Sequence, residues 1–179
     1  MLNQILNNRI ILVFIIPFFL GLLSVFSFQP FNITLVNFLI IPIIFLILGN
    51  INKRSKNKYR KKPHLKNLFF VGYLFGIGFF LSGTYWISYS LTFDENLKIL
   101  IPFSIILIPL FLGLFFGLAS LLSGTFMKKN YSSFFLFCLI FSFIDYLRGN
   151  VLSGFPWNLW SYSWSWLVEI IQVLNPIGF

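Results

Sequence analysis

The sequence has few of the residues that carry out covalent chemistry. Its 179 residues include one cysteine, one histidine and four acidic residues. A single cysteine excludes an intrachain disulfide and any site built from several cysteines. One isolated histidine excludes a zinc centre, because such centres need three or four donor side chains. The sequence therefore predicts neither a metal ion nor another bound cofactor.

The lone cysteine and the lone histidine both have explanations that need no catalysis. Cys138 lies inside the continuous apolar run 134–143, where a small buried thiol packs like any hydrophobic side chain. No basic residue flanks it to stabilise a thiolate. His64 follows Pro63 in a strongly basic stretch and is interpreted as a solvated side chain.

Charge is also scarce, since 9% of the residues are charged whereas 58% are hydrophobic. The mean hydropathy of +0.89 lies outside the range of soluble globular domains. In a soluble protein the net charge of +9 would indicate nucleic acid, because Lys and Arg neutralise phosphates. Here the basic residues gather beside apolar segments, which favours anionic lipid headgroups. The sequence predicts a lipid bilayer as partner and no nucleic acid.

Long apolar runs predict an all-α fold, a polytopic transmembrane helix bundle. Crossing about 30 Å of hydrocarbon takes about 20 mostly apolar residues. By this criterion residues 1–179 form one N-terminal transmembrane domain with five spans and the start of a sixth. The predicted spans cover residues 10–28, 33–49, 68–91, 99–126, 132–147 and, incompletely, 165–179. Residues 50–67 form a basic loop, and residues 148–164 form a loop on the opposite side.

The basic residues are distributed unequally between the two sides. Eight of them fall in one loop: Lys53, Arg54, Lys56, Lys58, Arg60, Lys61, Lys62 and Lys66. A cytoplasmic N-terminus places eleven of the 13 basic residues on the cytoplasmic side, where short loops retain Lys and Arg. The loop 50–67 is then cytoplasmic and the loop 148–164 faces outward. His64 lies opposite the outward loops, which excludes a Ser-His-Asp triad.

Small residues predict where two of the spans touch. Lipid tails compete equally well for large apolar side chains, so helices in a bilayer associate through faces of small residues. Such residues share one face of span 68–91 and one face of span 99–126. They are Gly72, Gly76 and Gly83 in the first, and Gly113, Gly117, Ser120 and Gly124 in the second. We expect these two faces to meet.

Two charged residues stand three apart at the outer end of span 132–147. Asp145 and Arg148 lie on one face of a helix and can form an ion pair. One interpretation is an interfacial ion pair that orients the end of the helix. The other is that Arg148 binds an anionic lipid phosphate, which suits its bidentate guanidinium.

Residues 153–162 form the most unusual stretch of the chain. Gly154 and Pro156 interrupt a regular helix, and four tryptophans lie between positions 157 and 166. An aromatic belt at the membrane surface explains the tryptophans. It does not explain the Gly-Phe-Pro-Trp-Asn sequence at 154–158, a non-helical turn at membrane depth. Such a turn is tolerated only where it packs on protein or lines a cavity, which predicts a shaped site for a lipid.

Residues 147–158, Leu-Arg-Gly-Asn-Val-Leu-Ser-Gly-Phe-Pro-Trp-Asn, resemble the Leu-Arg-Gly and Gly-Phe-Pro-Trp segment of bacterial apolipoprotein N-acyltransferases. Residues 73–91, with Gly76, Gly78, Gly83 and Trp86, are similar to the third membrane helix of that family. Residues 28–31, Phe-Gln-Pro-Phe, are similar to its first periplasmic turn. Tyr162, Ser163 and residues 172–178 also agree, so the resemblance covers nearly the whole chain.

The resemblance implies a multi-pass enzyme of the bacterial inner membrane with a cytoplasmic N-terminus. Members of the family carry a nitrilase-like domain on a bundle of membrane helices and work in lipoprotein maturation. They transfer an acyl chain from a phospholipid, through a thioester on a catalytic cysteine, to the N-terminal amine of a diacylglyceryl-cysteine lipoprotein. The implied partners are therefore phospholipid and diacylglyceryl lipoprotein.

The resemblance also assigns a site. The Glu, Lys and Cys triad of the family belongs to the nitrilase-like domain, and Cys138 matches no part of it. No catalytic residue is therefore carried over, and we expect residues 1–179 to be inactive alone. The residues expected to bind substrate lie in the periplasmic loop beneath the active site: Arg148, Gly154, Phe155, Pro156 and Trp157.

Two other functions stay open at the level of sequence. A small transporter predicts charges near the middle of the membrane or inverted repeats, whereas the charges here lie at helix ends and no internal repeat is found. A non-catalytic membrane scaffold would use the loop 148–164 as a protein contact. Phospholipid that copurifies with the protein would separate the scaffold from the acyltransferase.

Overall fold

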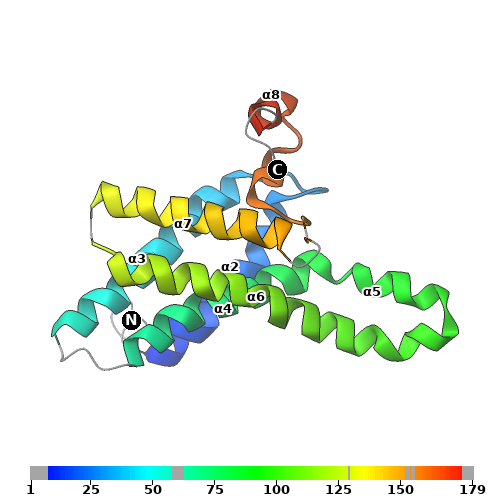
Figure 1. Cartoon of the computed structure of the whole chain (residues 1–179), viewed down its shortest axis with the longest axis horizontal. Coiled ribbons are helices and arrows are strands. Elements are labelled where there is room, and N and C mark those ends of the chain that lie inside the picture. Colours follow the sequence, from blue (N-terminus) through cyan, green and yellow to red (C-terminus); the bar gives the residue numbers. More distant parts are fainter. Residues whose placement is uncertain (1–7, 58–62, 129, 152–153, 155, 175–179) are drawn as a thin grey trace.

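Figure 1 shows the computed structural model, in which helices pack around a central pair. The structure describes residues 8–57, 63–128, 130–151, 154 and 156–174, and these residues form helices and turns without a strand. The predicted all-α class is confirmed. Four helices are long and apolar enough to cross a membrane: Leu35–Lys53, His64–Thr84, Glu95–Phe126 and Tyr131–Asn150. A shorter apolar helix covers Ile11–Ser27.

The helices follow one another along the chain with short connections. The first apolar helix consists of η1 (Ile11–Ile15), α2 (Ile16–Ser24) and η2 (Val25–Ser27). The long helices are α3 (Leu35–Asn57), α4 (Pro63–Thr84), α6 (Ile101–Phe126) and α7 (Tyr131–Asn150). Between α4 and α6 lie α5 (Ile87–Ser90), η3 (Leu91–Phe93) and η4 (Glu95–Leu100). After α7 come η5 (Trp160–Trp164), α8 (Val168–Ile171) and η6 (Gln172–Leu174).

The observed bounds differ from the predicted spans at three places. α3 and α4 both extend into residues 50–67, the predicted basic loop. α4 ends at Thr84, and the rest of the predicted span 68–91 lies in a turn and in α5. Within residues 165–174, the predicted start of a sixth span contains only α8 and η6. Lys58, Arg60, Lys61 and Lys62 of the basic cluster lie outside the described residues.

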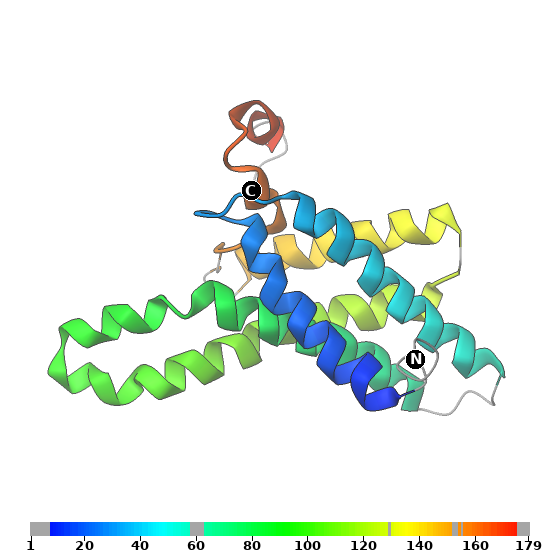
Figure 2. The same ribbon diagram turned by 180° about the vertical axis from the view of Figure 1, so that it is seen from behind.

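One part of the molecule extends away from the other helices. Figures 1 and 2 show α5 and the first turns of α6 projecting together to one side. Large apolar side chains along this arm are exposed, among them Tyr89, Phe93 and Ile99. Asp94 caps η4 at the tip by accepting a hydrogen bond from the backbone N–H of Asn96 at 2.9 Å. The arm thus exposes an apolar surface close to charged and polar residues.

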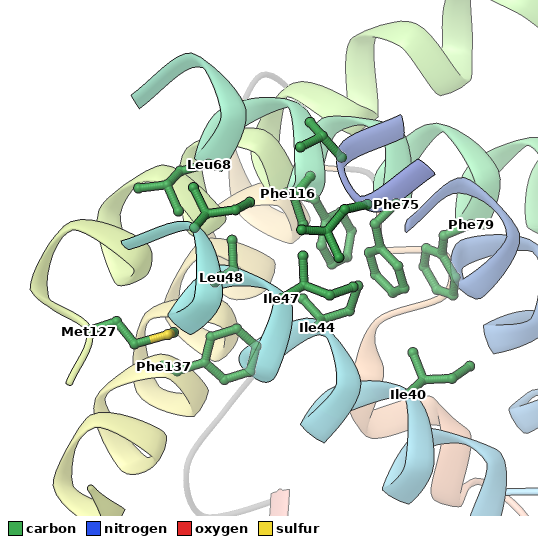
Figure 3. Close-up of a cluster of buried hydrophobic side chains, with 14 of the residues drawn as sticks. Ile40, Ile44, Ile47, Leu48, Leu68, Phe75, Phe79, Phe116, Met127 and Phe137 are labelled. Carbon is green, nitrogen blue, oxygen red and sulfur yellow. The ribbon is translucent and has the colours of Figure 1, made fainter. Parts of the chain in front are cut away.

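α4 is the central helix and carries the core. Phe75, Phe79 and Phe80 are almost fully buried, and all three rings contact Phe116 of α6. Figure 3 shows Phe75, Phe79 and Phe116 together, with Ile44 and Ile47 projecting toward them from α3. Because the surrounding lipid is as apolar as the core, dispersion contacts between well-packed side chains are the main attraction here.

The predicted contact between the two glycine faces is confirmed. A Cβ added at Gly72 would overlap the backbone oxygen of Phe116, and one added at Gly76 would overlap the backbone of Gly113. The prediction was wrong for Gly83, because a Cβ there would meet Asn158 of the loop after α7. Spacing along one helix face does not reveal that the loop after α7 occupies the space beside Gly83.

A second close contact joins α2 to α4 and was not predicted. A Cβ at Gly21 would overlap the backbone oxygen of Phe75, and one at Gly78 would overlap that of Phe18. α4 therefore has glycines on two faces and approaches α2 and α6 at backbone distance. This packing fixes the outer end of α4, on which the loop after α7 rests.

Candidate functional site

A buried ion pair lies in the last turns of α7. Nη2 and Nε of Arg148 donate hydrogen bonds to Oδ1 of Asp145, at 2.7 and 3.1 Å. Arg148 is 1% exposed and Asp145 is 7% exposed. The guanidinium also lies over the ring of Phe80, 4.9 Å from its centroid, in cation–π geometry. Of the two interpretations from sequence, the ion pair is thus present.

The ion pair also holds the backbone of the following loop. Nη1 of Arg148 donates to the carbonyl oxygen of Trp157 at 2.9 Å, and Nη2 donates to that of Asn158 at 3.3 Å. The second carboxylate oxygen of Asp145 accepts a hydrogen bond from the backbone N–H of Trp160 at 2.8 Å. Together the two side chains satisfy three backbone groups that no helix or strand pairs.

Two residues give the loop its non-helical course. Gly154 has a φ of +73° and Asn158 has a φ of +53°, a region in which glycine and asparagine are favoured. The side-chain amide of Asn158 donates to the backbone oxygen of Gly83 at 3.1 Å. Since a Cβ at Gly83 would overlap that amide, the absence of a side chain at Gly83 allows the loop to reach α4.

The loop enters the layer of helices and is not confined to its surface. The Trp160 ring stacks on Phe75 and Phe79, with centroids 6.1 and 6.0 Å apart. At 1.5 Å per residue, Phe75 lies about 14 Å along α4 from its outer end at Thr84. The backbone of the loop lies nearer the end of α7, because the N–H of Trp160 is bonded to Asp145, which precedes the last residue of α7 by five positions. Non-helical backbone among membrane helices is tolerated only when protein groups satisfy it. The Asp145–Arg148 pair provides those groups.

The outer surface of the loop presents an aromatic pair. Trp157 is 52% exposed and Trp86 is 46% exposed. Their rings meet edge to face with centroids 5.4 Å apart, and the indole N–H of Trp86 donates to the backbone oxygen of Gly83 at 3.0 Å. Pro156 is exposed beside them. This surface can contact an apolar chain or an amphipathic headgroup region.

A second set of contacts ties the end of the loop to α3. The hydroxyl of Thr34 donates to the backbone oxygen of Ser163 at 2.9 Å and accepts from the indole N–H of Trp166 at 2.8 Å. Phe38 and Trp164 meet edge to face at 6.0 Å. The loop is thus anchored to α3, α4 and α7.

The five predicted site residues differ in how far they are buried and in what they contact. Arg148 is buried and directs its guanidinium at Asp145 and at the loop backbone. Gly154 is half-buried, whereas Pro156 and Trp157 are exposed. Phe155 lies outside the described residues. Sequence reasoning placed Asn158 and Trp160 in the unusual stretch 153–162 but did not assign them to the site, and it missed Thr34. Asn158 gave a usable signal, because asparagine often adopts a positive φ after a Pro-containing turn.

The described part of the chain offers little for covalent chemistry. It contains no group of three His, Cys, Asp or Glu side chains that could hold a metal ion. Cys138 is on α7 and lines an apolar cavity together with Phe75 and Trp160. The arrangement is suited to binding and positioning an apolar or amphipathic molecule.

Comparison with known proteins identifies relatives of the chain. Residues 20–179 match the profile of the family described as apolipoprotein N-acyltransferase N-terminal domain. The chain is 32% identical to the apolipoprotein N-acyltransferase of Rickettsia typhi over 165 residues, covering 92% of this chain and 31% of the relative. It is 30% identical to that of Rhodopseudomonas palustris over 166 residues, covering 92% and 30%.

A third relative is more similar over a shorter stretch. The apolipoprotein N-acyltransferase of Rickettsia bellii is 38% identical over 109 residues, which cover 60% of this chain and 22% of the relative. In these three alignments the chain therefore spans between about a fifth and a third of the length of the curated relatives that it matches.

Proposed function

The chain belongs to the apolipoprotein N-acyltransferase family, and we propose that residues 1–179 form membrane helices of an enzyme that N-acylates lipoproteins. The enzyme takes an acyl chain from a phospholipid and transfers it to the N-terminal amine of a diacylglyceryl-cysteine lipoprotein. The observation that carries the proposal is the family match over residues 20–179. That stretch includes the loop after α7 and the ion pair that holds it.

The loop residues have different roles in this proposal. Gly154, Pro156 and Trp157 form the surface that contacts the lipid substrates, and Trp86 extends it. Phe155, which is also expected to bind substrate, lies outside the described residues. Arg148 is a positioning residue, because its guanidinium is directed at the carbonyl oxygens of Trp157 and Asn158. Lipid specificity then depends on the shape that Arg148 gives to the loop.

The proposal includes an orientation. The protein crosses the bacterial inner membrane several times with a cytoplasmic N-terminus, and the loop after α7 faces the periplasm. The excess of basic residues at the opposite end supports this orientation. Residues 1–179 alone do not transfer an acyl chain, because acyl transfer through a covalent intermediate needs a nucleophile with a base in reach. Cys138, the only cysteine, lies in an apolar cavity.

A chimera tests the proposed function. Residues 1–179 replace the aligned segment of the Rickettsia typhi relative, and the chimera is expressed in cells depleted of their own N-acyltransferase. The mass of the N-terminal lipopeptide of a reporter lipoprotein is measured. We expect the lipopeptide to gain one amide-linked acyl chain with the chimera and none with residues 1–179 alone. A chimera that reaches the membrane in normal amount and leaves the amine free would refute the proposal.

A matched pair of variants tests the contact surface. Trp157→Ala in the chimera removes an exposed ring of the loop and should lower the rate of acylation while the protein stays folded. Tyr131→Ala removes an exposed ring at the other end of α7, where the side chain is 87% exposed, and should leave the rate unchanged. Equal rates in all three proteins would mean that Trp157 is only an interfacial aromatic residue. That result would favour a scaffold role for the loop.

A further inference from the structure

An apolar cleft opens between α3 and α7, on a side of the bundle separate from the Trp86–Trp157 surface. Its volume is about 170 Å³. α3 lines it with Ile40 and Ile44, and α7 lines it with Phe137. Phe75 of α4 and Trp160 of the loop also line it, and Figure 3 shows Ile44 of α3 near Phe75.

The walls of the cleft are nearly free of polar groups. Cys138 and Ser142 are the only lining side chains that carry a sulfur or an oxygen atom, and both lie on α7. Outside the cleft, α3 and α7 present fully apolar exposed side chains such as Leu39 and Leu139, at 69% and 66% exposure. Such apolar surfaces beside the cleft are suited to contact with lipid tails.

The size of the cleft decides among possible occupants. A transmembrane helix is about 10–12 Å wide with its side chains, so only its side chains, and not its backbone, would enter a cleft of about 170 Å³. An apolar cavity of roughly 150 Å³ holds one benzene molecule, so the cleft holds a segment of a single hydrocarbon chain. A second copy of the protein could cover the opening of the cleft, but its backbone could not fill the space inside.

A buried amide lies at the outer end of the same helix face. Asn37 precedes Ile40, Ile41 and Ile44 by three, four and seven residues, which places all four on one face of α3. Asn37 is 5% exposed, and neither atom of its amide has a hydrogen-bond partner among the described residues. Burying a polar atom without a hydrogen-bond partner costs free energy. A ligand that offers a hydrogen-bond donor or acceptor to this amide would therefore be stabilised.

We propose that the cleft binds one acyl chain of a bilayer phospholipid, with the ester of that chain close to Asn37 and the methylene groups against Phe75 and Trp160. Asn37 lies about 3 Å along the helix from the outer end of α3, and Ile44 about 14 Å from it. A polar amide followed by apolar side chains along α3 matches the order of groups in a phospholipid, in which the ester is followed by the methylene groups of the acyl chain.

The bound chain would connect the bilayer to the outer loop. Trp160 contacts the chain through its ring, and its backbone N–H is bonded to Asp145. A lipid in the cleft therefore stabilises the part of the loop that enters the helix layer. The inference needs a bilayer around the helices but does not rest on the acyl-transfer reaction.

Quenching of Trp160 fluorescence tests the proposal. Trp86, Trp157, Trp164 and Trp166 are replaced by Phe, and the full chain is placed in nanodiscs of phosphatidylcholine brominated near the middle of its acyl chains. Bromine quenches a tryptophan that touches it, so Trp160 should be quenched although its ring lies inside the bundle. A Trp160 that is not quenched would overturn the proposal, because protein or empty space would then occupy the cleft.

Two variants on α7 show whether the lipid reaches Trp160 through the cleft. Ser142→Phe fills the cleft from its wall and should abolish quenching. Ser132→Phe makes the same change at an exposed position of the same helix and should leave quenching as it was. Circular dichroism confirms that both proteins keep their helices. Quenching that survives Ser142→Phe in a folded protein would contradict the proposed route.

Competition between lipids tests the role of Asn37. Unbrominated diester phosphatidylcholine should relieve the quenching of Trp160 better than its diether analogue, which lacks the ester carbonyl. Asn37→Leu should remove this preference and leave quenching itself intact. If the two lipids compete equally well in the protein with Asn37, the ester does not lie near the amide and the proposed orientation of the chain is wrong.

Discussion

Two helix pairs in the same bundle meet in opposite ways. α4 and α6 approach at backbone distance, since a Cβ at Gly72 or Gly76 would overlap the facing helix. α3 and α7 stand apart around a cleft of about 170 Å³ that is lined by isoleucine and phenylalanine. Both pairs are apolar, so apolar character alone does not decide which helices close together.

The difference follows from the shape of the facing side chains. In lipid, a large apolar side chain gains little by leaving the solvent, and close packing provides the attraction. Glycine faces let two backbones approach, whereas Ile44 and Phe137 keep α3 and α7 separated. The loop after α7 then places Trp160 between them, held by the Asp145–Arg148 pair. The open pair therefore depends on the ion pair, whereas the closed pair is held mainly by its glycine contacts.

Among the variants that test this difference between the two helix pairs, removal of the Arg148 side chain should lower the free energy of unfolding the most. Arg148→Leu leaves the buried carboxylate of Asp145 without its cation, and breaking a buried ion pair in this way costs about 3–5 kcal/mol. The loop should leave the helix layer while α4 and α6 stay together. The free energy of unfolding is measured by SDS titration in mixed micelles.

A double variant separates the charge from the loop contacts. Asp145→Leu with Arg148→Leu removes both charges, but the carbonyl oxygens of Trp157 and Asn158 and the N–H of Trp160 still lose their partners. We expect the double variant to remain less stable than the unsubstituted protein. If it is equally stable, the ion pair does not hold the loop.

The next largest effect should come from truncating one large side chain in each helix pair. The loss of stability should be greater in the closed pair than in the open pair. Leu68 is fully buried and lies against Gly124 of α6, so Leu68→Ala should cost about 2–5 kcal/mol through the cavity that it creates. Ile41 already borders the cleft, so Ile41→Ala should cost about 1 kcal/mol. The same titration measures both, and equal costs would contradict the contrast.

Adding one methyl group at a glycine should give effects of opposite sign in the two regions, and the change at Gly49 should be the smallest of all. At Gly72 a Cβ would overlap the backbone oxygen of Phe116, so Gly72→Ala should destabilise by about 1–3 kcal/mol. At Gly49 on α3 the nearest atom to a Cβ is the Met127 sulfur at 3.5 Å, an ordinary contact. Gly49→Ala should therefore stabilise by about 0.5–1 kcal/mol. A Gly72→Ala variant that is not destabilised would mean that α4 and α6 can separate without cost. A destabilised Gly49→Ala variant would mean that the Met127 side chain cannot accommodate the added methyl group.

The close contact between α4 and α6 was predictable from sequence, whereas the cleft between α3 and α7 was not. Glycines that recur on one helix face show directly where a backbone can approach, which is why the contact of Gly72 and Gly76 with α6 could be inferred. The contact of Gly21 with α4 was missed because a single glycine has no period. The cleft depends on the relative position of α3 and α7, and no local pattern in either helix encodes it.

The candidate site was predictable in position but not in architecture. The Gly-Phe-Pro-Trp-Asn sequence marked the loop, and the spacing of Asp145 and Arg148 marked the ion pair. That Arg148 donates to the carbonyl oxygens of Trp157 and Asn158 depends on a loop folding back over the helix that precedes it. Such a contact arises from the tertiary structure, so the sequence favoured the ion pair and left the lipid phosphate open as the alternative.

Hydrogen exchange of the Trp160 backbone amide tests the central claim most directly. The claim is that a buried ion pair holds a non-helical loop inside the helix layer, and this amide donates to Asp145 at 2.8 Å. In nanodiscs the amide should exchange slowly, as amides inside α4 do, and should exchange rapidly in the Arg148→Leu variant. Rapid exchange in the unsubstituted protein would mean that the loop lies at the membrane surface.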